Sequence, residues 1–262
     1  IPTIGRVRLK EFGYLPQGVT IKNGHVSCEA GRYYVSVTVE IDETSRYNND
    51  LETSYHPQSD GIGVDLGVKS LAIVSDGRIF ENINMSSRAR RLEKRLRREQ
   101  RRLSRKYEMR KRKGGSTATA SANIEKKKSS VQKLHQRLAN LRRNHENQVI
   151  HALVEQKPRF ITVEDLNVTG MMKNRHLSKA VAQQRFYSFR EKLRRKAEII
   201  GIEFRIADRF YPSSKTCHAC GHVHSGLKLK DRVYVCPACG FTEDRDLNAA
   251  LNLRDTKNYS IA

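Results

Sequence analysis

Residues 61–67 read Gly61-Ile-Gly-Val-Asp-Leu-Gly67, a short apolar segment that contains a single carboxylate, Asp65. A second apolar segment follows at 70–75, and Asp76-Gly77 predicts a turn into a third at 78–83. Short apolar runs bounded by turn residues are typical of strands in the interior of a sheet. This stretch therefore predicts consecutive strands at the start of an α/β domain.

Helices and strands alternate after these strands. Apolar stripes such as Leu92, Leu96 and Leu103 predict two long antiparallel helices, the first at 87–113, joined by a Gly-, Ser-, Thr- and Ala-rich loop at 114–122. A strand, a helix ending at Gly201, a strand and a closing helix are then predicted at 160–166, 177–199, 202–207 and 246–253. The fold class is therefore α/β, in an order compatible with an RNase H-like mixed sheet.

The first 42 residues favour strands alone. From Val35 to Ile41, apolar β-branched residues alternate with polar ones, which is the period of a strand with one buried face. Asn23-Gly24 separates two β-type runs and predicts a hairpin turn at that point. The polar stretch at 43–60 is interpreted as a linker, so a separate β unit is expected in front of the α/β domain.

Basic side chains are concentrated in one part of the chain. The sequence has a net charge of +22, and residues 86–147 contain 22 basic and 5 acidic side chains, a net charge of +17. Such a field suits a polyanion, because neutralised phosphates release their counterions. Phosphate binding is therefore predicted for arginines on the free faces of the first long helix: Arg91, Arg95, Arg98, Arg102 and Arg105. The alternative is a solvated, charged helix without a ligand.

Composition also limits the cellular setting. No run approaches the roughly 20 apolar residues of a membrane span, and no signal peptide is recognisable at the start. Four of the five cysteines form two CxxC pairs, a pattern typical of a metal site in a reducing compartment rather than of disulfides. We therefore expect a cytoplasmic protein that has no membrane partner.

The two cysteine pairs, Cys217-x-x-Cys220 and Cys236-x-x-Cys239, are separated by 15 residues. Each pair predicts a tight turn that places two thiolates side by side, and the two turns together can close a tetrahedral Zn²⁺ site. Gly221 and Gly240 follow the second cysteine of each pair, where the backbone must turn sharply. Four thiolates leave no open coordination position, so a single structural zinc ion is predicted; the alternative is four unliganded thiols.

Carboxylates mark a second candidate site. Asp65 lies within an apolar strand, Glu164 and Asp165 end another, and Asp244 and Asp246 precede the closing helix. A buried carboxylate is costly unless it is paired or binds a metal. Three such groups from separate elements could bind two Mg²⁺ ions for phosphodiester hydrolysis. Alternatively, Asp246 caps a helix, and Glu164 or Asp165 is bonded to a loop at a strand end.

Four motifs occur here in one order: Gly63-Val-Asp-Leu-Gly67, Val163-Glu-Asp-Leu-Asn167, Tyr211-Pro-Ser-Ser-Lys-Thr-Cys217 with its paired CxxC, and Asp244-Arg-Asp-Leu-Asn-Ala-Ala-Leu-Asn252. Over nearly the whole chain this combination resembles the TnpB (OrfB) family of insertion-sequence proteins. Members of this family are also described as probable transposases, and they are relatives of type V CRISPR effectors. The resemblance implies a RuvC-type nuclease that is guided by a transposon-derived RNA and cuts DNA beside a short motif. It further implies Asp65, Glu164 and Asp246 as catalytic, magnesium-binding residues and the four cysteines as zinc ligands. Asp246 is preferred over Asp244 because the family's metal-binding aspartate lies two positions before the Asn matched by Asn248.

The resemblance also implies a division of the chain. Residues 1–56 are expected to form a partial, wedge-like β-barrel and 57–210 a RuvC-type core, which includes a basic helical hairpin at 86–155. A zinc ribbon at 211–242 and the end of the nuclease core at 243–262 follow. The family's helical recognition region and the first part of its wedge have no counterpart here, and Arg194-Arg195 stands where relatives often have an acidic and an aromatic residue.

The resulting hypothesis is a metal-dependent, RNA-guided DNA endonuclease of prokaryotic cytoplasm, associated with the nucleoid. Its expected partners are a guide RNA from the transposon end and target DNA, and it is expected to act as a monomer. A nuclease-inactive, RNA-guided DNA-binding repressor is the alternative, although such a protein would be expected to lose one of the three carboxylates. A transposase that joins DNA ends itself is a third interpretation, with no sequence feature that suggests a strand-transfer partner.

Overall fold

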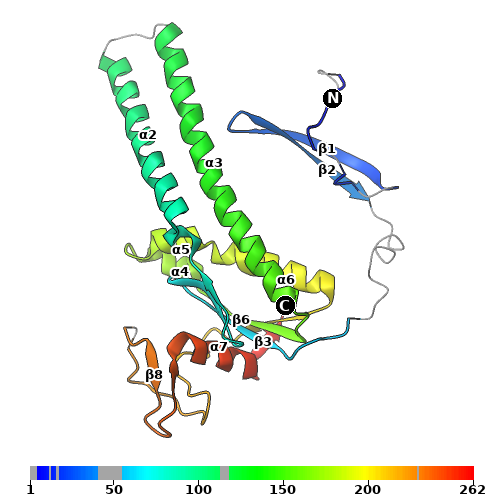
Figure 1. Ribbon diagram of the computed structural model, residues 1–262, viewed down its shortest axis with the longest axis vertical. Coiled ribbons are helices and arrows are strands. Elements are labelled where there is room, and N and C mark those ends of the chain that lie inside the picture. Colours follow the sequence, from blue (N-terminus) through cyan, green and yellow to red (C-terminus); the bar gives the residue numbers. More distant parts are fainter. Residues whose placement is uncertain (1–4, 12, 16–17, 41–54, 113–117, 229) are drawn as a thin grey trace. The chain divides into compact units, whose positions relative to one another are not determined.

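The computed structural model describes residues 5–11, 13–15, 18–40, 55–112, 118–228 and 230–262. The chain forms two compact units, Ile1–Ser54 and Tyr55–Ala262. Figure 1 labels their helices and strands, and each unit is described by itself below. Most of the predicted linker at 43–60 lies outside the described residues.

The first unit contains an antiparallel pair of strands, β1 (Thr20–Glu29) and β2 (Arg32–Glu40). The hairpin turn predicted at Asn23-Gly24 is wrong, because β1 runs through it and only shifts register there. The chain turns instead at Ala30-Gly31, whose φ angles of 51° and 76° give the left-handed backbone that a two-residue turn needs. Within the described part of this unit the sheet has two strands, so the barrel stays a prediction.

A mixed sheet of six strands organises the second unit, in the order β10-β7-β6-β3-β4-β5. The strand β3 pairs antiparallel with β4 and parallel with β6, and β7 continues the parallel half. All strands predicted in this unit are present, and β10 was not foreseen. Their bounds are β3 (Ile62–Leu66), β4 (Ser70–Val74), β5 (Ile79–Glu81), β6 (Phe160–Glu164), β7 (Glu203–Ala207) and β10 (Tyr259–Ile261).

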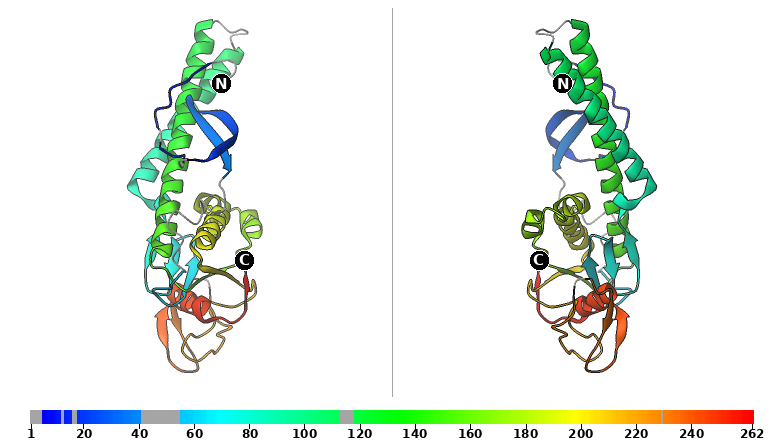
Figure 2. Two further views of the ribbon diagram at one scale, coloured as in Figure 1. Left: turned by 90° about the vertical axis from the view of Figure 1, so that its right-hand side faces the viewer. Right: turned by 90° about the vertical axis from the view of Figure 1, so that its left-hand side faces the viewer.

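Helices cover both faces of this sheet. Figure 1 shows α3 (Ala118–Val154) and α6 (Phe186–Ile200) on one side and α7 (Arg245–Asp255) on the other, and the side views of Figure 2 agree. The main core lies between the sheet and the first pair, with Phe186, Phe189 and other fully buried side chains. On the other side α7 touches β3 backbone to backbone, because a Cβ added at Gly63 would lie 2.0 Å from the carbonyl oxygen of Ala250.

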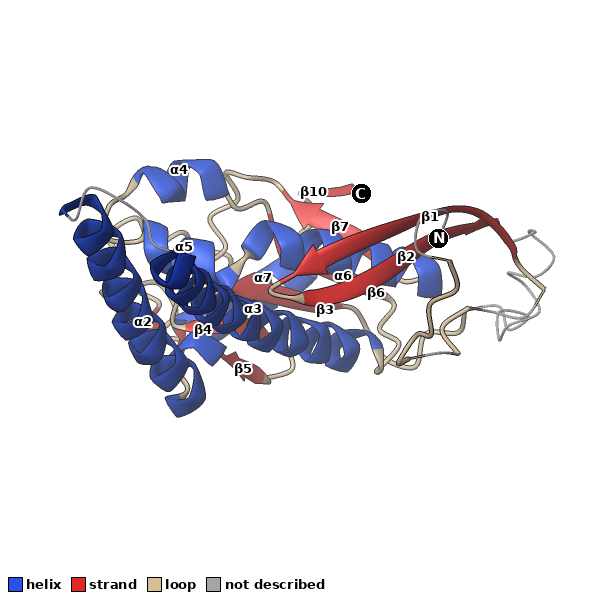
Figure 3. Ribbon diagram, turned by 90° about the horizontal axis from the view of Figure 1, so that it is seen from above, coloured by secondary structure: helices blue, strands red, loops and turns tan. Residues whose placement is uncertain are grey.

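The predicted helical hairpin is confirmed. The helix α2 (Ser87–Arg112) packs against α3, and Figure 3 shows both helices from above. Leu96, Leu134 and Leu138 belong to a separate small core between them. The loop predicted at 114–122 is too long, since α3 begins at Ala118. Residues 118–122 belong to the helix instead, and three of these five residues are alanine, the strongest helix former.

The helix predicted at 177–199 is two helices. A break at Arg185, which has a φ of 56°, separates α5 (Ser178–Gln184) from α6. At the break the buried Gln184 side chain donates hydrogen bonds to the carbonyl oxygens of Gly67 and Val68. These bonds tie the end of α5 to the loop after β3, so the chain turns before it continues as α6. The short helices η1 (Ile83–Met85) and α4 (Val168–Lys173) were not predicted.

The last part of the chain is a small ribbon that leads into α7. Its strands β8 (Val233–Val235) and β9 (Thr242–Asp244) pair antiparallel, and Arg245 begins α7 directly after β9. The buried ring of Tyr234 forms a small core with Cys217 and Cys236. Among the described residues, no helix combines the length and the apolar character needed to cross a membrane.

Candidate metal centres and nucleic-acid interface

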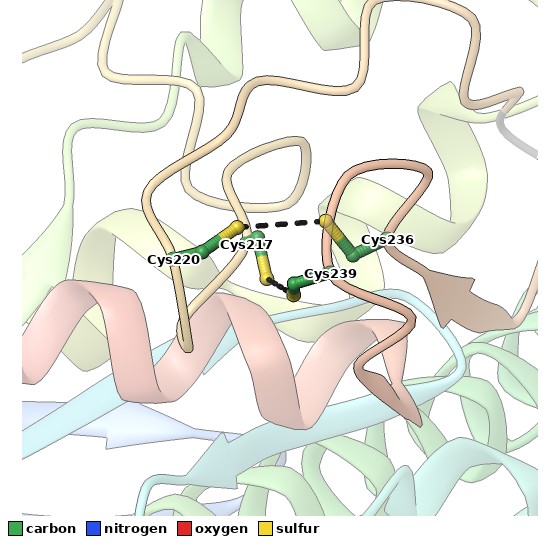
Figure 4. A group of neighbouring side chains, drawn as sticks. All are labelled: Cys217, Cys220, Cys236 and Cys239. Carbon is green, nitrogen blue, oxygen red and sulfur yellow. Dashed lines mark hydrogen bonds between the residues drawn. The ribbon is translucent and has the colours of Figure 1, made fainter.

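Four cysteines meet in the ribbon, as the sequence predicts. The sulfur atoms of Cys217, Cys220, Cys236 and Cys239 all lie within 4.8 Å of one another. Figure 4 shows the side chains converging from two loops, with Sγ–Sγ distances of 3.7 Å for Cys217 and Cys239 and 3.6 Å for Cys220 and Cys236. Four sulfur donors in one cluster fit a tetrahedral zinc ion.

The two cysteine turns have the same backbone construction. In the first, the N–H of Gly221 donates to the carbonyl of Cys217 and the N–H of Cys217 to that of His222; in the second, Gly240 and Phe241 repeat these bonds around Cys236. Both glycines have a positive φ, 74° and 76°, a backbone conformation that is strained for residues with a side chain. The backbone therefore fixes where each pair of sulfurs points without help from a distant element.

Backbone N–H groups prepare a thiolate in the second turn. Burial raises the pKa of Cys236, but N–H groups of Cys239 and Ala238 that point at its sulfur outweigh burial and lower that pKa to about 6. A deprotonated sulfur is the form that binds a metal. This turn is accordingly suited to receive a cation near neutral pH.

Asp65 and Glu164 come together at one end of the mixed sheet. The strands β3 and β6 run parallel and Val64 pairs with Val163, so the next residue on each strand is one of the two carboxylates. Burial raises the pKa of Asp65 well above its ordinary range, and repulsion by the carboxylates of Glu164 and Asp246 raises it further. Burial likewise raises the pKa of Glu164, to about 7.

Asp246 approaches this pair from α7, in the first turn of the helix. The helix cap is Asp244, whose Oδ1 accepts from the N–H groups of Asp246 and Leu247 at 2.9 and 3.1 Å, so the N-cap alternative for Asp246 is wrong. The carboxylate of Asp246 accepts hydrogen bonds from the Nη2 and Nε of Arg245 at 2.8 and 3.1 Å. Among the described residues, the four cysteines are the only group of three or more possible ligands whose ligand atoms all lie within 4.8 Å of one another. The carboxylate oxygens of Asp65, Glu164 and Asp246 are therefore spaced more widely than the sulfurs of the ribbon.

Asp165, the neighbour of Glu164, has a different set of partners. Arg190 Nη1 donates to its Oδ1 at 2.7 Å and Arg209 Nε to its Oδ2 at 2.8 Å. Burial alone would raise the pKa of Asp165, but these two guanidinium groups lower it below its ordinary value. Asp165 is therefore a strand-end residue that is bonded to neighbouring side chains, which was the alternative to a metal-binding role. Glu164 instead faces Asp65.

The five arginines named from the sequence are all exposed on α2. Arg102 also pairs with Glu99 at 2.9 Å, and Arg91 donates to the carbonyl of Ser87 at 3.3 Å. A shallow groove of about 420 Å³ lies on the same helix, and Arg97, Arg101 and Arg105 line it. The sequence analysis did not name Arg97 and Arg101. Their spacing of four residues, which places them on one face of the helix, could have identified them as neighbours of Arg105.

Two buried asparagines in α7 were also missed as functional candidates. Asn248 Oδ1 accepts from the N–H of His218 at 3.1 Å, and its Nδ2 donates to the carbonyl of Thr216 at 2.8 Å. Asn252 Nδ2 donates to the carbonyls of Ser213 and Thr216 at 2.8 and 2.7 Å. Both amides therefore join α7 to the first cysteine turn of the ribbon.

The fold and these sites define the class of protein: a mixed α/β domain with a group of partly buried carboxylates and a ribbon with a four-cysteine cluster. The chain belongs to the OrfB family of insertion sequence IS605, whose model is described as "Probable transposase" and matches residues 35–175. A second family model, described as "Cas12f1-like, TNB domain", matches residues 186–253. The two matches together include all three carboxylates and all four cysteines of the ribbon.

Curated relatives of the chain are named as endonucleases. The chain is 32% identical over 91% of its length to "Putative RNA-guided DNA endonuclease" of Streptomyces pristinaespiralis, and 30% identical over 97% to "Putative RNA-guided DNA endonuclease InsQ" of Escherichia coli K12. It is 24% identical over 86% to the CRISPR-associated endodeoxyribonuclease Cas12f1 of Sulfoacidibacillus thermotolerans. The chain spans 54%, 60% and 54% of these relatives, so it corresponds to little more than half of each.

Solved structures share the fold. A cryo-EM structure of a CRISPR-Cas12f ternary complex matches 93% of this chain and 46% of that one, with a TM-score of 0.53 and 18% identity. A cryo-EM structure of a Cas12f1–sgRNA–target DNA complex matches 88% of this chain and 55% of that one, with a TM-score of 0.50 and 16% identity. At these identities the likeness concerns the arrangement of the elements.

Proposed function

We propose that this chain contains the nuclease centre of a metal-dependent, RNA-guided DNA endonuclease encoded by a transposon. The observation that carries the proposal is the meeting of Asp65, Glu164 and Asp246 from β3, β6 and α7, with the electrostatic coupling that raises the pKa of the first two. The names of the curated relatives support it. The sheet supports an RNase H-like, RuvC-type assignment, because three antiparallel strands are continued by parallel ones on the far side of the first.

The residues present fit a divalent cation. Two adjacent carboxylates in a partly buried position repel each other, and the cost of ionising both is offset when a cation lies between them. Hard oxygen ligands from carboxylates are those that Mg²⁺ binds. Asp246 adds a third carboxylate from α7, and the three groups together are proposed to hold two magnesium ions.

Each part of the chain has a distinct role in this proposal. When bound, Mg²⁺ would activate water and stabilise the leaving oxygen of a phosphodiester. Asp65 and Glu164 hold their carboxylates on neighbouring parallel strands, and α7 carries Asp246 against them. The exposed arginines of α2 hold nucleic-acid backbone through charge, without reading sequence.

The ribbon is proposed to hold one structural zinc ion. Its four sulfurs complete a tetrahedral shell, so no position is left for a substrate. The ribbon would thus help to position α7 and would form part of the surface beside the carboxylates, without taking part in the chemical step.

The partners follow from the same proposal: a guide RNA from the transposon end and a matching DNA target, bound by a monomer at the nucleoid of a prokaryotic cell. The nuclease-inactive repressor remains the second candidate, because binding of RNA and DNA does not require the carboxylates. The presence of all three carboxylates in one place favours the enzyme.

Removing one carboxylate at a time tests the proposal. In the complete natural protein with its native RNA, Asp65→Ala, Glu164→Ala and Asp246→Ala should each lower Mg²⁺-dependent cleavage on the order of a thousandfold or more, because several kcal/mol of transition-state stabilisation is lost. Guided DNA binding should be retained. Asp76→Ala, which removes a carboxylate from the turn between β4 and β5, is the control and should cut normally. An unmutated protein that binds its matched target but never cuts, in Mg²⁺ or Mn²⁺, would establish the repressor instead.

A further inference from the structure

The helix α7 lies between the sheet and the ribbon, and its two sides differ in the kind of contact they make. On the sheet side the backbone of α7 at Ala250, Leu253 and Arg254 lies against Gly63. The side chains of Ala249, Ala250 and Leu253 are buried, so this contact is apolar. Apolar contact of this kind is not directional, so it limits the distance between α7 and β3 more strongly than it limits sliding or rotation of the helix.

The ribbon side makes directional contacts. Asn248 is fully buried and bonds to both an N–H and a carbonyl of the first cysteine turn, at 3.1 and 2.8 Å. Asn252, one turn further on, reaches two carbonyls of the same segment at 2.8 and 2.7 Å. Hydrogen bonds depend steeply on distance and angle, so these bonds fix both the rotation and the axial position of α7.

The same helix carries Asp246, two residues before Asn248. Successive residues are about 100° apart around a helix, so Asp246 points away from the Asn248 side, toward the sheet. The ribbon also holds this end of α7 directly, because the N–H of Arg245 donates to the carbonyl of Arg232, the residue before β8, at 2.8 Å. A shift of the ribbon is therefore transmitted to the Asp246 carboxylate through a rigid turn of helix.

We propose that Asn248 and Asn252 are positioning residues through which the zinc-loaded ribbon sets the place of Asp246, so that zinc in the ribbon strengthens divalent-metal binding at the carboxylates. The inference rests on the proposed function only in taking Asp246 as a metal ligand. The four-thiol ribbon then acts on the carboxylate site without touching substrate: it orders Ser213, Thr216 and His218, and these backbone groups orient the two amides.

The test measures Mn²⁺ affinity by electron paramagnetic resonance on the complete protein, without nucleic acid and with zinc content determined in parallel. Asn248→Ala that keeps about one zinc should bind Mn²⁺ on the order of tenfold more weakly, the size of loss known for residues that orient metal ligands, because the helix that carries Asp246 loses its fixed position. The matched control is Asn84→Ala, which removes a buried asparagine with three side-chain hydrogen bonds at the base of the helical hairpin. It should cost comparable stability and leave Mn²⁺ affinity unchanged.

A double-mutant cycle separates positioning from general loosening. Cys236→Ser, which removes a zinc ligand, should weaken Mn²⁺ binding by a similar factor, and the combination with Asn248→Ala should add little, because both changes break the same link. Losses that multiply would show two independent effects and would overturn the inference. Should Asn248→Ala fail to fold, Asn252→Ala takes its place in the cycle.

The outcomes also distinguish this inference from the proposed function. If Asp65→Ala loses Mn²⁺ but zinc-loaded Asn248→Ala binds it as tightly as the unmutated protein, the positioning role is wrong and the nuclease proposal stands. If the unmutated protein binds Mn²⁺ no better than Asp65→Ala, both fail together.

Discussion

The ribbon and the carboxylate site are both candidate cation sites, yet they are assembled in opposite ways. The four cysteines lie within 23 consecutive residues, and their own backbone turns bring the sulfurs within 4.8 Å. Asp65, Glu164 and Asp246 come from elements that are about a hundred and eighty residues apart at the extremes, and only the completed sheet and α7 bring them together. A local site can be formed before the fold; a dispersed site is a consequence of it.

The difference also appears in the energetics of the two sites. Backbone N–H groups lower the pKa of Cys236 to about 6, so one sulfur of the cluster is readily deprotonated, whereas hydrogen bonds to the other sulfurs raise the pKa of Cys220 to about 12. Burial raises the pKa of Asp65 and of Glu164, and repulsion by the carboxylate of Asp246 raises both further, so the fold disfavours the charged forms that would bind a metal. In the proposed function, metal binding at the carboxylates therefore opposes stability, whereas zinc binding and folding of the ribbon coincide.

The largest effect is expected from Cys236→Ser. Zinc binding and local folding are one event, so loss of a ligand should lower zinc content below one per chain and the melting temperature by on the order of 10 °C. Metal analysis and calorimetry measure both. Cys28→Ser is the control, because Cys28 is exposed on β1 and lies outside the cluster. A metal-free, fully folded ribbon with an unchanged melting temperature would break the comparison.

Glu164→Gln should have the opposite sign. Removing a charge that the fold disfavours should raise the free energy of unfolding by roughly 1–3 kcal/mol at neutral pH without divalent cations, while abolishing cleavage. Denaturation in urea, with and without Mg²⁺, measures the gain. Mg²⁺ should stabilise the unmutated protein and have little effect on the variant. A destabilised Glu164→Gln protein would mean that the carboxylate site is not strained.

The pH dependence sharpens the same point. The folded-state pKa of Glu164, about 7, lies above its ordinary value of 4.5, so the folded form holds the proton more tightly than the unfolded chain. Its stabilising contribution is complete below about pH 4.5 and is lost as the pH rises through about 7. In cation-free buffer the unmutated protein should therefore lose more stability between pH 5 and 8 than Glu164→Gln does. Parallel slopes for the two proteins would contradict the assignment.

The smallest effect on stability is expected in the helical hairpin, which is also encoded locally. Replacing Arg95 and Arg98, which are exposed on α2, should leave zinc content and melting temperature nearly unchanged. It should reduce the slope of log affinity against log salt by about one or two units, without changing sequence preference. Binding titrations at several salt concentrations measure the slope. An unchanged slope would show that these arginines do not contact phosphates and belong to a solvated helix face.

What could be predicted from the sequence divides along the same line. The CxxC spacing and the leucine stripe of α2 are local patterns, and the structure has both where they were expected. Asp65, the Glu164-Asp165 pair and the Asp244/Asp246 pair could be named as candidates from their places at apolar strands and before a helix. The choice of Glu164 and Asp246 from the two pairs came from the family resemblance. The roles of Asn248 and Asn252 could not be foreseen, because their partners are backbone groups some thirty residues or more away.

The wrong predictions have local causes as well. The periodicity of buried residues continues through Val181, Phe186, Phe189 and Leu193, so it conceals the break that Gln184 and Arg185 introduce. Asn-Gly is a strong turn signal, yet Ala30-Gly31 makes the turn that matches the pairing of the longer strands. In both places the local conformation is determined by contacts with residues that only the completed fold brings near, so the local sequence pattern does not reveal it.

The backbone contact at Gly63 gives the molecule one dimension that mutation cannot adjust. A Cβ there would also lie 2.4 Å from the nitrogen of Arg254, so no other residue fits without moving α7. Anyone who shortens or grafts parts of this protein must therefore preserve the spacing of α7 and β3, whatever changes are made elsewhere.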